Sequence, residues 1–374
     1  MSIEILPYAA SHVEAVMRFN ERLKAGGVTM EFPTSPVPRW LPKIAVPALF
    51  QEYFLAVENG TEVRGAYSLK HQDFRILGET VSLADFHSPI SESVVKRAYA
   101  PIGGSLLLDA QRRQPLLFGL GMGSYDEAAT RLYRAVGWSL FTVPFYFRIL
   151  RPFRFLRQIE YLRKSIMGRG LAEALAWTGL GWLGVTIVQG VRGKRGGQRP
   201  PVVADVVDDF GPWADDLWNA CRDEYTACAV RDRAVLQTLY PRANATFIRL
   251  RVRQADKTLG WAVLLNTQMS GHRQFGGMRV GSIVDCFASP GDAGYVVRAA
   301  QAILQQQGAD LLVSNQLHAA WCRALSDAGF LRGPSNFILG ASAPLTRLLR
   351  LDSPGARADG IHVNRGDGEG PANL

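Results

Sequence analysis

An internal repeat is the feature of the sequence that most constrains the fold. The segment LADFHSP at residues 83–89 recurs as VDCFASP at residues 284–290. Each copy is followed by a similar helix end, RLYRAVGW at 131–138 and RALSDAGF at 323–330. A glycine also stands before an aromatic-containing strand in each half, at Gly65 and Gly260. Matches that keep the same order along the chain indicate a duplicated domain.

The length of the chain agrees with two domains. At 374 residues it exceeds the size at which a single hydrophobic core keeps growing. We predict an N-terminal domain at 1–150, a linker at 151–200 and a C-terminal domain at 201–345. Residues 346–374 are expected to form a disordered tail, because the end of the chain is rich in Gly, Asp, Asn, Pro and Arg and has few apolar residues.

Hydrophobic periodicity and turn signals predict the same order of elements in both halves. The first half is expected to hold strands at 3–6, 53–57, 63–70, 80–86, 116–120 and 139–148, with helices ending at 24, 113 and 136. The second half is expected to hold strands at 202–207, 246–252, 259–266, 282–287 and 311–314, with helices at 212–228, 292–307 and 318–328. Strands and helices in this mixture indicate an α+β fold, with a mixed central sheet flanked by helices in each domain.

The positive charge of the chain is concentrated between the two copies. Residues 148–199 contain eleven basic and two acidic side chains, so this segment carries the whole formal net charge of +9. A protein that binds nucleic acid along one face would spread its basic residues over that face. We therefore expect no nucleic-acid partner for the folded domains.

The basic segment also contains an uncharged run of residues, 174–191, with Trp177 and Trp182. A run of this length is a marginal membrane span, and its four glycines and two basic flanks argue against one. A connector packed on the protein is the favoured interpretation, and peripheral membrane contact through 151–195 is the alternative. The four cysteines form no CxxC pair and no export signal is visible, so we expect a reduced cytoplasmic protein, with membrane-peripheral placement as the alternative.

The element order, with a helix that ends in Tyr-x-x-x-Gly-Trp before a final strand, resembles the acyl-CoA N-acyltransferases of the GNAT superfamily. The resemblance covers about residues 1–150 and 201–345 and implies two tandem domains of that fold. It also implies that the fourth and fifth strands of a domain splay apart and hold the pantetheine arm of coenzyme A. The following helix would bind the pyrophosphate through backbone amides in a Gln/Arg-x-x-Gly-x-Gly/Ala loop.

Both copies depart from that loop pattern. The first reads KRAYAPIGGS at 96–105, in which Gly103, Gly104 and Ser105 align with the phosphate-binding positions. The second reads SPGDAG at 289–294, where Asp292 is expected to cap the helix and to repel a phosphate. The first domain is thus the expected cofactor site, with Phe86 from the splayed strand beside it. The alternative is that the two glycines only separate a strand from a helix.

The resemblance also implies acid and base groups. Tyr133 matches the tyrosine that protonates the departing thiolate in many members, whereas the second copy has Leu325. Asp85 and His87 are candidates for the base, and strand alternation puts them on one face, opposite Phe86. A packed phenol and a surface histidine remain the alternatives. The corresponding polar residues of the second copy are Asp285, Asn315 and His318.

The leading hypothesis is an acyltransferase that moves an acyl group from acetyl-CoA or another acyl-CoA to an amine or hydroxyl of a small-molecule acceptor. One alternative is a FemAB-like aminoacyl or peptidyl transferase, which takes its acyl group from charged tRNA. A second is a non-catalytic binding module of the same fold. The sequence has no nucleophile elbow, no dinucleotide fingerprint and no His-Glu-x-x-His, so no metal site is predicted.

Overall fold

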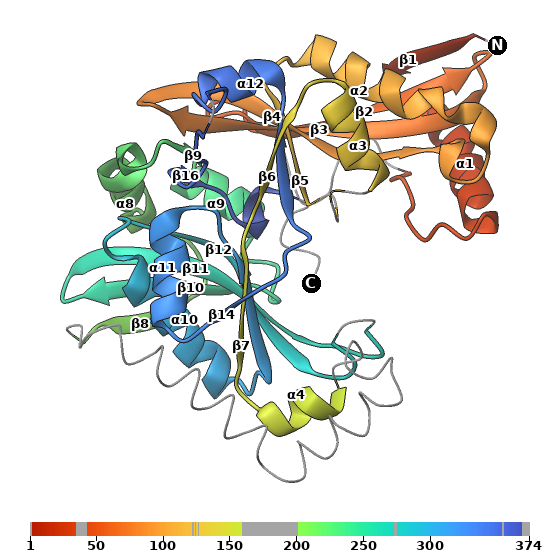
Figure 1. Ribbon diagram of the computed structural model, residues 1–374. Coiled ribbons are helices and arrows are strands. Elements are labelled where there is room, and N and C mark those ends of the chain that lie inside the picture. Colours follow the sequence, from red (N-terminus) through yellow and green to blue (C-terminus); the bar gives the residue numbers. More distant parts are fainter. Residues whose placement is uncertain are drawn as a thin grey trace. The chain divides into compact units, whose positions relative to one another are not determined.

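The computed structural model describes residues 2–34, 43–121, 123, 125, 127–158, 201–272, 275–353 and 355–368 (Figure 1). The chain forms two compact units, each with its own sheet. Unit 1 comprises Met1–Thr142, Thr226–Val230 and Asn336–Arg357, and unit 2 comprises Val143–Tyr225, Arg231–Ser335 and Ala358–Leu374. Most of the predicted linker, including the run 174–191, lies outside the described residues.

The sheet of unit 1 has the strand order β1-β2-β3-β4-β5-β15-β6. All neighbours are antiparallel except β4 and β5, which are parallel. The strands are β1 Ile3–Pro7, β2 Leu49–Glu58, β3 Glu62–Ile76, β4 Glu79–Ser91, β5 Leu117–Gly121, β6 Ser139–Thr142 and β15 Ile338–Ala341, and β9 Ala227–Ala229 pairs with the end of β3. The helices are α1 Val13–Ala25, α2 Pro101–Arg113, α3 Ala128–Ala135 and α12 Ala343–Leu348.

The sheet of unit 2 has the strand order β14-β7-β13-β12-β11-β10-β8, with the parallel pair at β12 and β13. Its strands are β7 Phe145–Ile149, β8 Val203–Val207, β10 Ile248–Gln254, β11 Lys257–Gln268, β12 Arg279–Ala288, β13 Leu311–Asn315 and β14 Leu331–Gly333. Unit 2 also contains the short strand β16 Ile361–His362, which is not part of this sheet. Its helices are α4 Pro152–Gln158, α8 Trp213–Cys221, α9 Arg233–Leu239, α10 Ala293–Gln306 and α11 Ala319–Asp327. The two sheets therefore share one topology.

The two halves of the sequence exchange one strand each. The predicted strand at 139–148 is in fact two strands, β6 in unit 1 and β7 in unit 2, and the chain changes unit between Thr142 and Val143. In the second half β14 lies in unit 2, while β15 lies in unit 1 between β5 and β6. Pro144 lacks the amide hydrogen that a continuous strand would need at this break. The predicted boundaries at 150 and 201 thus do not separate the compact units.

The repeated glycines have a structural reason. A Cβ at Gly65 would lie 2.7 Å from Cγ2 of Ile102 on α2, and a Cβ at Gly260 would lie 2.5 Å from Cγ2 of Val296 on α10. In each unit the glycine is thus where the helix that follows the fourth strand packs most closely on the sheet. A side chain at either position would force that helix away.

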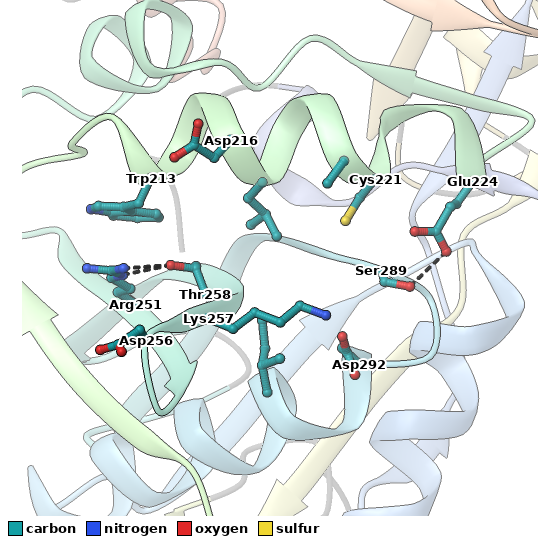
Figure 2. Close-up of a pocket in the computed structure, with 13 residues that line it drawn as sticks. Trp213, Asp216, Cys221, Glu224, Arg251, Asp256, Lys257, Thr258, Ser289 and Asp292 are labelled. Carbon is teal, nitrogen blue, oxygen red and sulfur yellow. Dashed lines mark hydrogen bonds between the residues drawn. The ribbon is translucent and has the colours of Figure 1, made fainter.

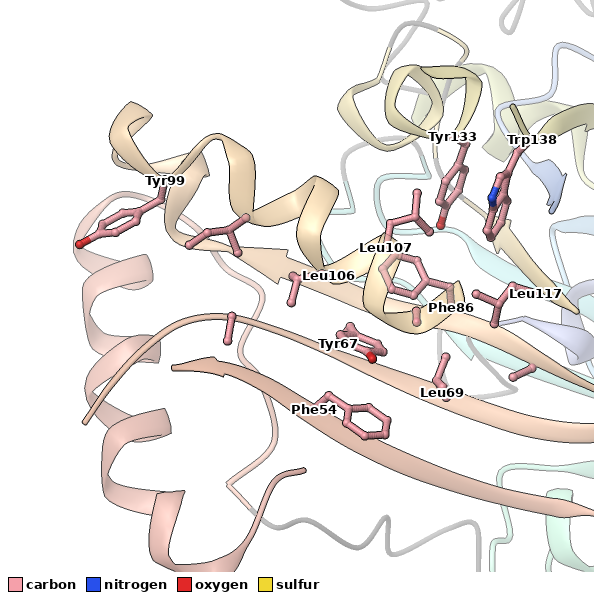
Figure 3. Packing of buried hydrophobic residues seen from close by; sticks show 14 residues of the cluster. Phe54, Tyr67, Leu69, Phe86, Tyr99, Leu106, Leu107, Leu117, Tyr133 and Trp138 are labelled. Carbon is pink, nitrogen blue, oxygen red and sulfur yellow. The ribbon is translucent and has the colours of Figure 1, made fainter. Parts of the chain in front are cut away.

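Aromatic side chains form one side of the core of unit 1 (Figure 3). The rings run from Tyr67 to Phe86, with centroids 5.2 Å apart, and from Phe86 to Tyr133, 6.3 Å apart. Tyr133 stacks on Trp138 at 4.3 Å with an interplanar angle of 7°. Stacked and edge-on rings pack densely and hold one another in fixed orientations. The orientation of Tyr133 is therefore set by its neighbours on both sides.

The C-terminal segment differs from the expectation. Of the tail predicted to be disordered, residues 346–353 and 355–368 are described, and they include the end of α12 and β16. Nearly all of residues 361–368 are buried. Composition predicted disorder because the segment has few apolar side chains, but its polar groups find buried partners in unit 2. Among the described residues, no helix combines the length and apolar character needed to cross a membrane.

Candidate active site at the divergence of β4 and β5

The parallel strands β4 and β5 separate after one short stretch of pairing. Their last paired residues are Asp85 and Phe118. Beyond this point β4 continues along β3, with an irregular register and a positive φ of 46° at Ser88, while β5 continues along β15. Beyond Asp85 on β4 and Phe118 on β5, the backbone groups of the two strands therefore no longer pair with each other. This divergence lies at the carboxyl ends of the two parallel strands, where binding sites form in mixed and parallel sheets.

Tyr133 extends from α3 to this divergence. A Cβ at Gly119, the first β5 residue past the last β4 pair, would lie 2.8 Å from the Tyr133 hydroxyl oxygen. Burial, and after it the negative charge of Asp85, raise the pKa of the Tyr133 phenol well above its ordinary value. The phenol is thus a protonated donor held beside the backbone of β5.

Asp85 and His87 lie on the other face of β4. Phe86 and Ala84 belong to the core that contains Tyr133, whereas Asp85 is directly across from Lys70 on β3. Oδ2 of Asp85 is 3.2 Å from Nδ1 of His87, so the two side chains form a hydrogen-bonded pair. Asp85 is only 1% exposed, and its Oδ1 has no hydrogen-bond partner within the described residues. The structure therefore brings Asp85 and His87 together but separates them from Tyr133 by the thickness of the strand.

The first turn of α2 carries the two predicted phosphate-binding glycines. The helix begins at Pro101, so Gly103 and Gly104 lie inside its first turn and not in the preceding loop. No side chain caps this end, and the first turn has no acidic residue. A Cβ at either glycine would meet nothing closer than the Leu132 side chain at 3.9 Å. The backbone amides here are open to an anion, as the positive end of a helix requires.

Ser105 lies beyond this turn and points to solvent. Its hydroxyl donates a hydrogen bond to the carbonyl oxygen of Pro101 at 3.3 Å. Phe86 is the remaining predicted cofactor residue, and its ring is buried in the core. That burial leaves the backbone of Phe86 as the group that can face a ligand.

Unit 2 places its corresponding residues differently. Asp292 is the N-cap residue of α10, but its carboxylate accepts no capping hydrogen bond, so the expected capping interaction is wrong. His318 is the N-cap of α11 and accepts from the amide of Ala320, and burial lowers its pKa to about 4. Leu325, at the position of Tyr133, is fully buried. Asp285 lies in a buried ionic network, and Asn315 is buried at the end of β13.

A surface pocket of about 510 Å³ lies elsewhere in unit 2, between α8 and the start of α10 (Figure 2). Trp213 packs over Arg251 at 5.1 Å, and Ser289 donates to Glu224 at 2.7 Å. Burial raises the pKa of the Cys221 thiol in this pocket to about 11, so the thiol stays protonated and unreactive. The lining of the pocket also includes the carboxylates of Asp216, Glu224, Asp256 and Asp292. Across the described ranges, no group of three or more His, Cys, Asp or Glu side chains is arranged to hold a metal ion.

Two features of the structure, one in each unit, were not predicted from the sequence. Gly119 lies on β5, within the predicted strand at 116–120, but no pattern in the sequence indicated that this glycine makes room for the phenol of Tyr133. The partners of Asp285 come from residues that are distant in the chain, and no local pattern marks them.

No protein-family model and no curated protein matches the sequence. Solved structures do match. A probable N-acyltransferase from Enterococcus faecalis is 11% identical over 92% of this chain and 74% of that chain, with a TM-score of 0.52. Saccharomyces cerevisiae N-myristoyltransferase with bound myristoyl-CoA is 9% identical over 91% and 78%, with a TM-score of 0.51. A GCN5-related N-acetyltransferase from Anabaena variabilis is 12% identical over 91% and 72%, with a TM-score of 0.50. The chain has the fold of the GNAT superfamily in two α+β units, which confirms the fold that the sequence predicted.

Proposed function

We propose that unit 1 transfers an acyl group from an acyl-CoA to an amine or hydroxyl of a small-molecule acceptor. One observation carries the proposal: the protonated phenol of Tyr133 lies against Gly119, where β4 and β5 separate. A thiolate that leaves an acyl group at this point needs a proton, and a buried phenol beside the strand end is suited to supply it. Three structural neighbours with acyltransferase names support the class of reaction, and the acceptor is a further proposal.

The first turn of α2 fits the pyrophosphate of coenzyme A. The uncapped amides, the absence of acidic side chains in that turn and the open space over Gly103 and Gly104 favour an anion. Ser105 would lie at the edge of this site. The backbone of Phe86 and the residues after it on β4, released from β5, would hold the pantetheine arm. The bound thioester supplies an activated acyl carbon, and we propose acetyl or a longer acyl chain as the group transferred.

The acid and the base would work from opposite faces of β4. Nε2 of His87 would take the proton of the acceptor amine or hydroxyl as it attacks the acyl carbon, while Asp85, hydrogen-bonded to Nδ1, would orient the ring and stabilise its positive charge. The hydroxyl of Tyr133 would give its proton to the thiolate sulfur as the thioester bond breaks. The attacking atom and the departing sulfur are different substituents of the tetrahedral intermediate, so the base and the acid act on different atoms and need not share a face of the strand.

Calorimetry with coenzyme A tests the cofactor site. Titration into the full chain is expected to show saturable binding, and Gly104→Val should abolish it, because the added side chain occupies the phosphate position. Leu108→Ala, at an exposed position one turn further along α2, is the matched control and should bind nearly as well. If the wild-type chain takes up no coenzyme A, the proposed function is wrong and a non-catalytic module or a tRNA-dependent transferase becomes the better interpretation.

For the location of the protein we propose the cytoplasm, with peripheral membrane contact through residues 151–195 as a separate proposal. Within the described part of that segment, α4 has Phe153 at 43% exposure with Arg157 over its ring. In sedimentation with vesicles of anionic lipid, the wild-type chain should pellet with the vesicles. The double variant Phe153→Ala, Arg157→Glu should stay in the supernatant. Equal pelleting of both proteins would contradict a contact through α4.

A further inference from the structure

Unit 2 repeats the strand divergence of unit 1. The last pair between β12 and β13 is Ile283 with Ser314. After it β12 continues to Ala288 along β11, while β13 ends at Asn315. Asp285 lies two residues past the last pair on β12, as His87 does on β4 in unit 1. By topology alone, unit 2 would offer a second place for a pantetheine arm.

The C-terminal segment of the chain contacts both sides of this divergence. The carbonyl oxygen of Val363 accepts a hydrogen bond from the amide of Leu317, which follows β13, at 3.0 Å. Asn364 forms a β-bridge with Gln316 on the same side. The Asn364 side chain then donates to Oδ1 of Asp285, on β12, at 2.9 Å. Residues 363 and 364 therefore lie between the ends of the two strands.

A buried ionic network holds this segment in place. Arg231 donates to Oδ2 of Asp285 at 2.8 Å and to Oδ1 of Asp367. The hydroxyl of Tyr240 donates to the same Asp285 oxygen at 2.6 Å. Burial opposes ionisation of Asp285, yet the Arg231 charge and the hydrogen bonds from Tyr240 and Asn364 hold its pKa below the ordinary value. A buried charge triad of this kind is costly to break, because one partner would be left uncompensated.

The packing around Gly366 shows how closely the segment fits. A Cβ at this position would lie 2.5 Å from the Tyr240 hydroxyl and 2.8 Å from Cβ of Asp285. The amide of Gly366 donates to the Asn364 side chain at 2.9 Å, which closes the turn that follows β16. No room remains for even a methyl group between Gly366 and the side chains of Tyr240 and Asp285. Space for a second ligand is therefore taken by the chain itself.

We propose that residues 362–367 are a resident ligand of unit 2, filling the β12–β13 divergence, so that the chain binds one acyl-CoA and binds it in unit 1. The inference rests on the proposed function for the site in unit 1. Two further observations support it. Both oxygens of Asp285 accept hydrogen bonds, and one of these comes from Asn364 of the segment itself. The N-cap residue of α10 is also the acidic Asp292, whereas the N-cap residue of α2 is Ala100.

Binding stoichiometry is the first arm of the test. Calorimetric titration of coenzyme A into the full chain is expected to saturate at one equivalent, and Gly104→Val is expected to remove all of it. Two equivalents in the wild type, one of which persists in Gly104→Val, would mean that the second divergence is open and would overturn the inference while leaving the proposed function standing. A single equivalent that persists unchanged in Gly104→Val would overturn the inference and would also contradict the cofactor site proposed in unit 1.

Hydrogen exchange is the second arm and does not depend on coenzyme A. Amides in peptides spanning 361–368, and the amide of Leu317, are expected to exchange slowly without ligand and at the same rate with saturating coenzyme A. Fast exchange without ligand would overturn the inference even if no cofactor bound, and so would protection that is lost when coenzyme A is added. If these amides exchange slowly but the chain binds no coenzyme A, the inference that residues 362–367 fill the divergence stands, and only the proposed acyltransferase function is wrong.

Discussion

The hydroxyl oxygen of Tyr133 and the backbone of Gly119 lie so close that a Cβ at position 119 would be 2.8 Å from that oxygen. Gly119 begins the part of β5 that has separated from β4, so the absence of a side chain there determines where the phenol can lie. The glycine lies on β5 and the tyrosine on α3, so this fit between them forms only when the two elements pack together.

The first prediction concerns this pair. Gly119→Ala should destabilise unit 1 by about 1–3 kcal/mol, the usual cost of overpacking a filled core, and should lower acyl transfer by displacing the phenol. In the Tyr133→Phe background the same change should cost less, because the closest atom has been removed. Urea denaturation of the four proteins of this double-mutant cycle measures the coupling. Strictly additive effects would show that the two residues do not interact.

The second prediction concerns Tyr133 as proton donor. Tyr133→Phe should lower kcat by roughly 10²-fold, within the range of general acid catalysis, with little change in coenzyme A affinity. Burial and Asp85 raise the pKa of this phenol, so it remains protonated through neutral and mildly alkaline pH. The loss should therefore be similar at pH 7 and pH 9. Trp138→Phe, which keeps a ring stacked on Tyr133, is the control and should retain most of the activity.

The third prediction separates stability from cofactor binding at α2. Gly103→Ala should raise the free energy of unfolding by about 0.5–1 kcal/mol, because alanine favours a helix and its Cβ meets nothing closer than 3.9 Å. The same substitution should weaken coenzyme A binding, since the methyl group stands where the phosphate would approach the amides. Thermal unfolding and calorimetry measure the two effects. Unchanged affinity in a stabilised variant would show that these glycines have no role in binding.

The fourth prediction concerns acid. Burial lowers the pKa of His362 to about 4, so the folded protein keeps it neutral while the unfolded chain takes up a proton near its ordinary pKa. Above about pH 6.5 His362 is neutral in both states and the free energy of unfolding has its full value. As the pH falls from there to about 4, only the unfolded chain protonates this histidine, so the free energy of unfolding decreases. The loss should reach about 3 kcal/mol. His362→Gln should flatten the fall in urea stability between pH 7.5 and 5. An equally steep fall in that variant would assign it to other groups.

The fifth prediction follows from the exchanged strands. A fragment of residues 1–150 lacks β15, so the edges of β5 and β6 lose their shared partner and the fragment should aggregate. Fragments 1–158 and 201–374 produced together should instead copurify as a folded complex. Size-exclusion chromatography and circular dichroism distinguish the outcomes. A monomeric 1–150 fragment with cooperative unfolding would contradict the exchange.

Local patterns were sufficient for much of the fold and part of the site. Alternation along β4 correctly separated Asp85 and His87 from Phe86, because side chains on a strand follow a period of two wherever they occur. The repeated glycines correctly marked equivalent strands in two halves. The predicted helix at 212–228 was too long: α8 ends at Cys221, and residues 227–229 extend the sheet of unit 1. Nothing in the helical pattern could show that a strand was available to pair with them.

The sequence by itself determined the duplication, the order of elements and the fact that Tyr133 and the acid-free glycine turn occur only in the first half, since all of these depend on residue identity and short-range periodicity. Only the tertiary structure decided that β7 and β15 cross between the units, that Gly119 makes room for the phenol and that residues 362–367 fill the second divergence. These features join segments far apart in the chain. Their hydrogen bonds and buried charges exist only after the chain has closed those long loops, so no local pattern encodes them.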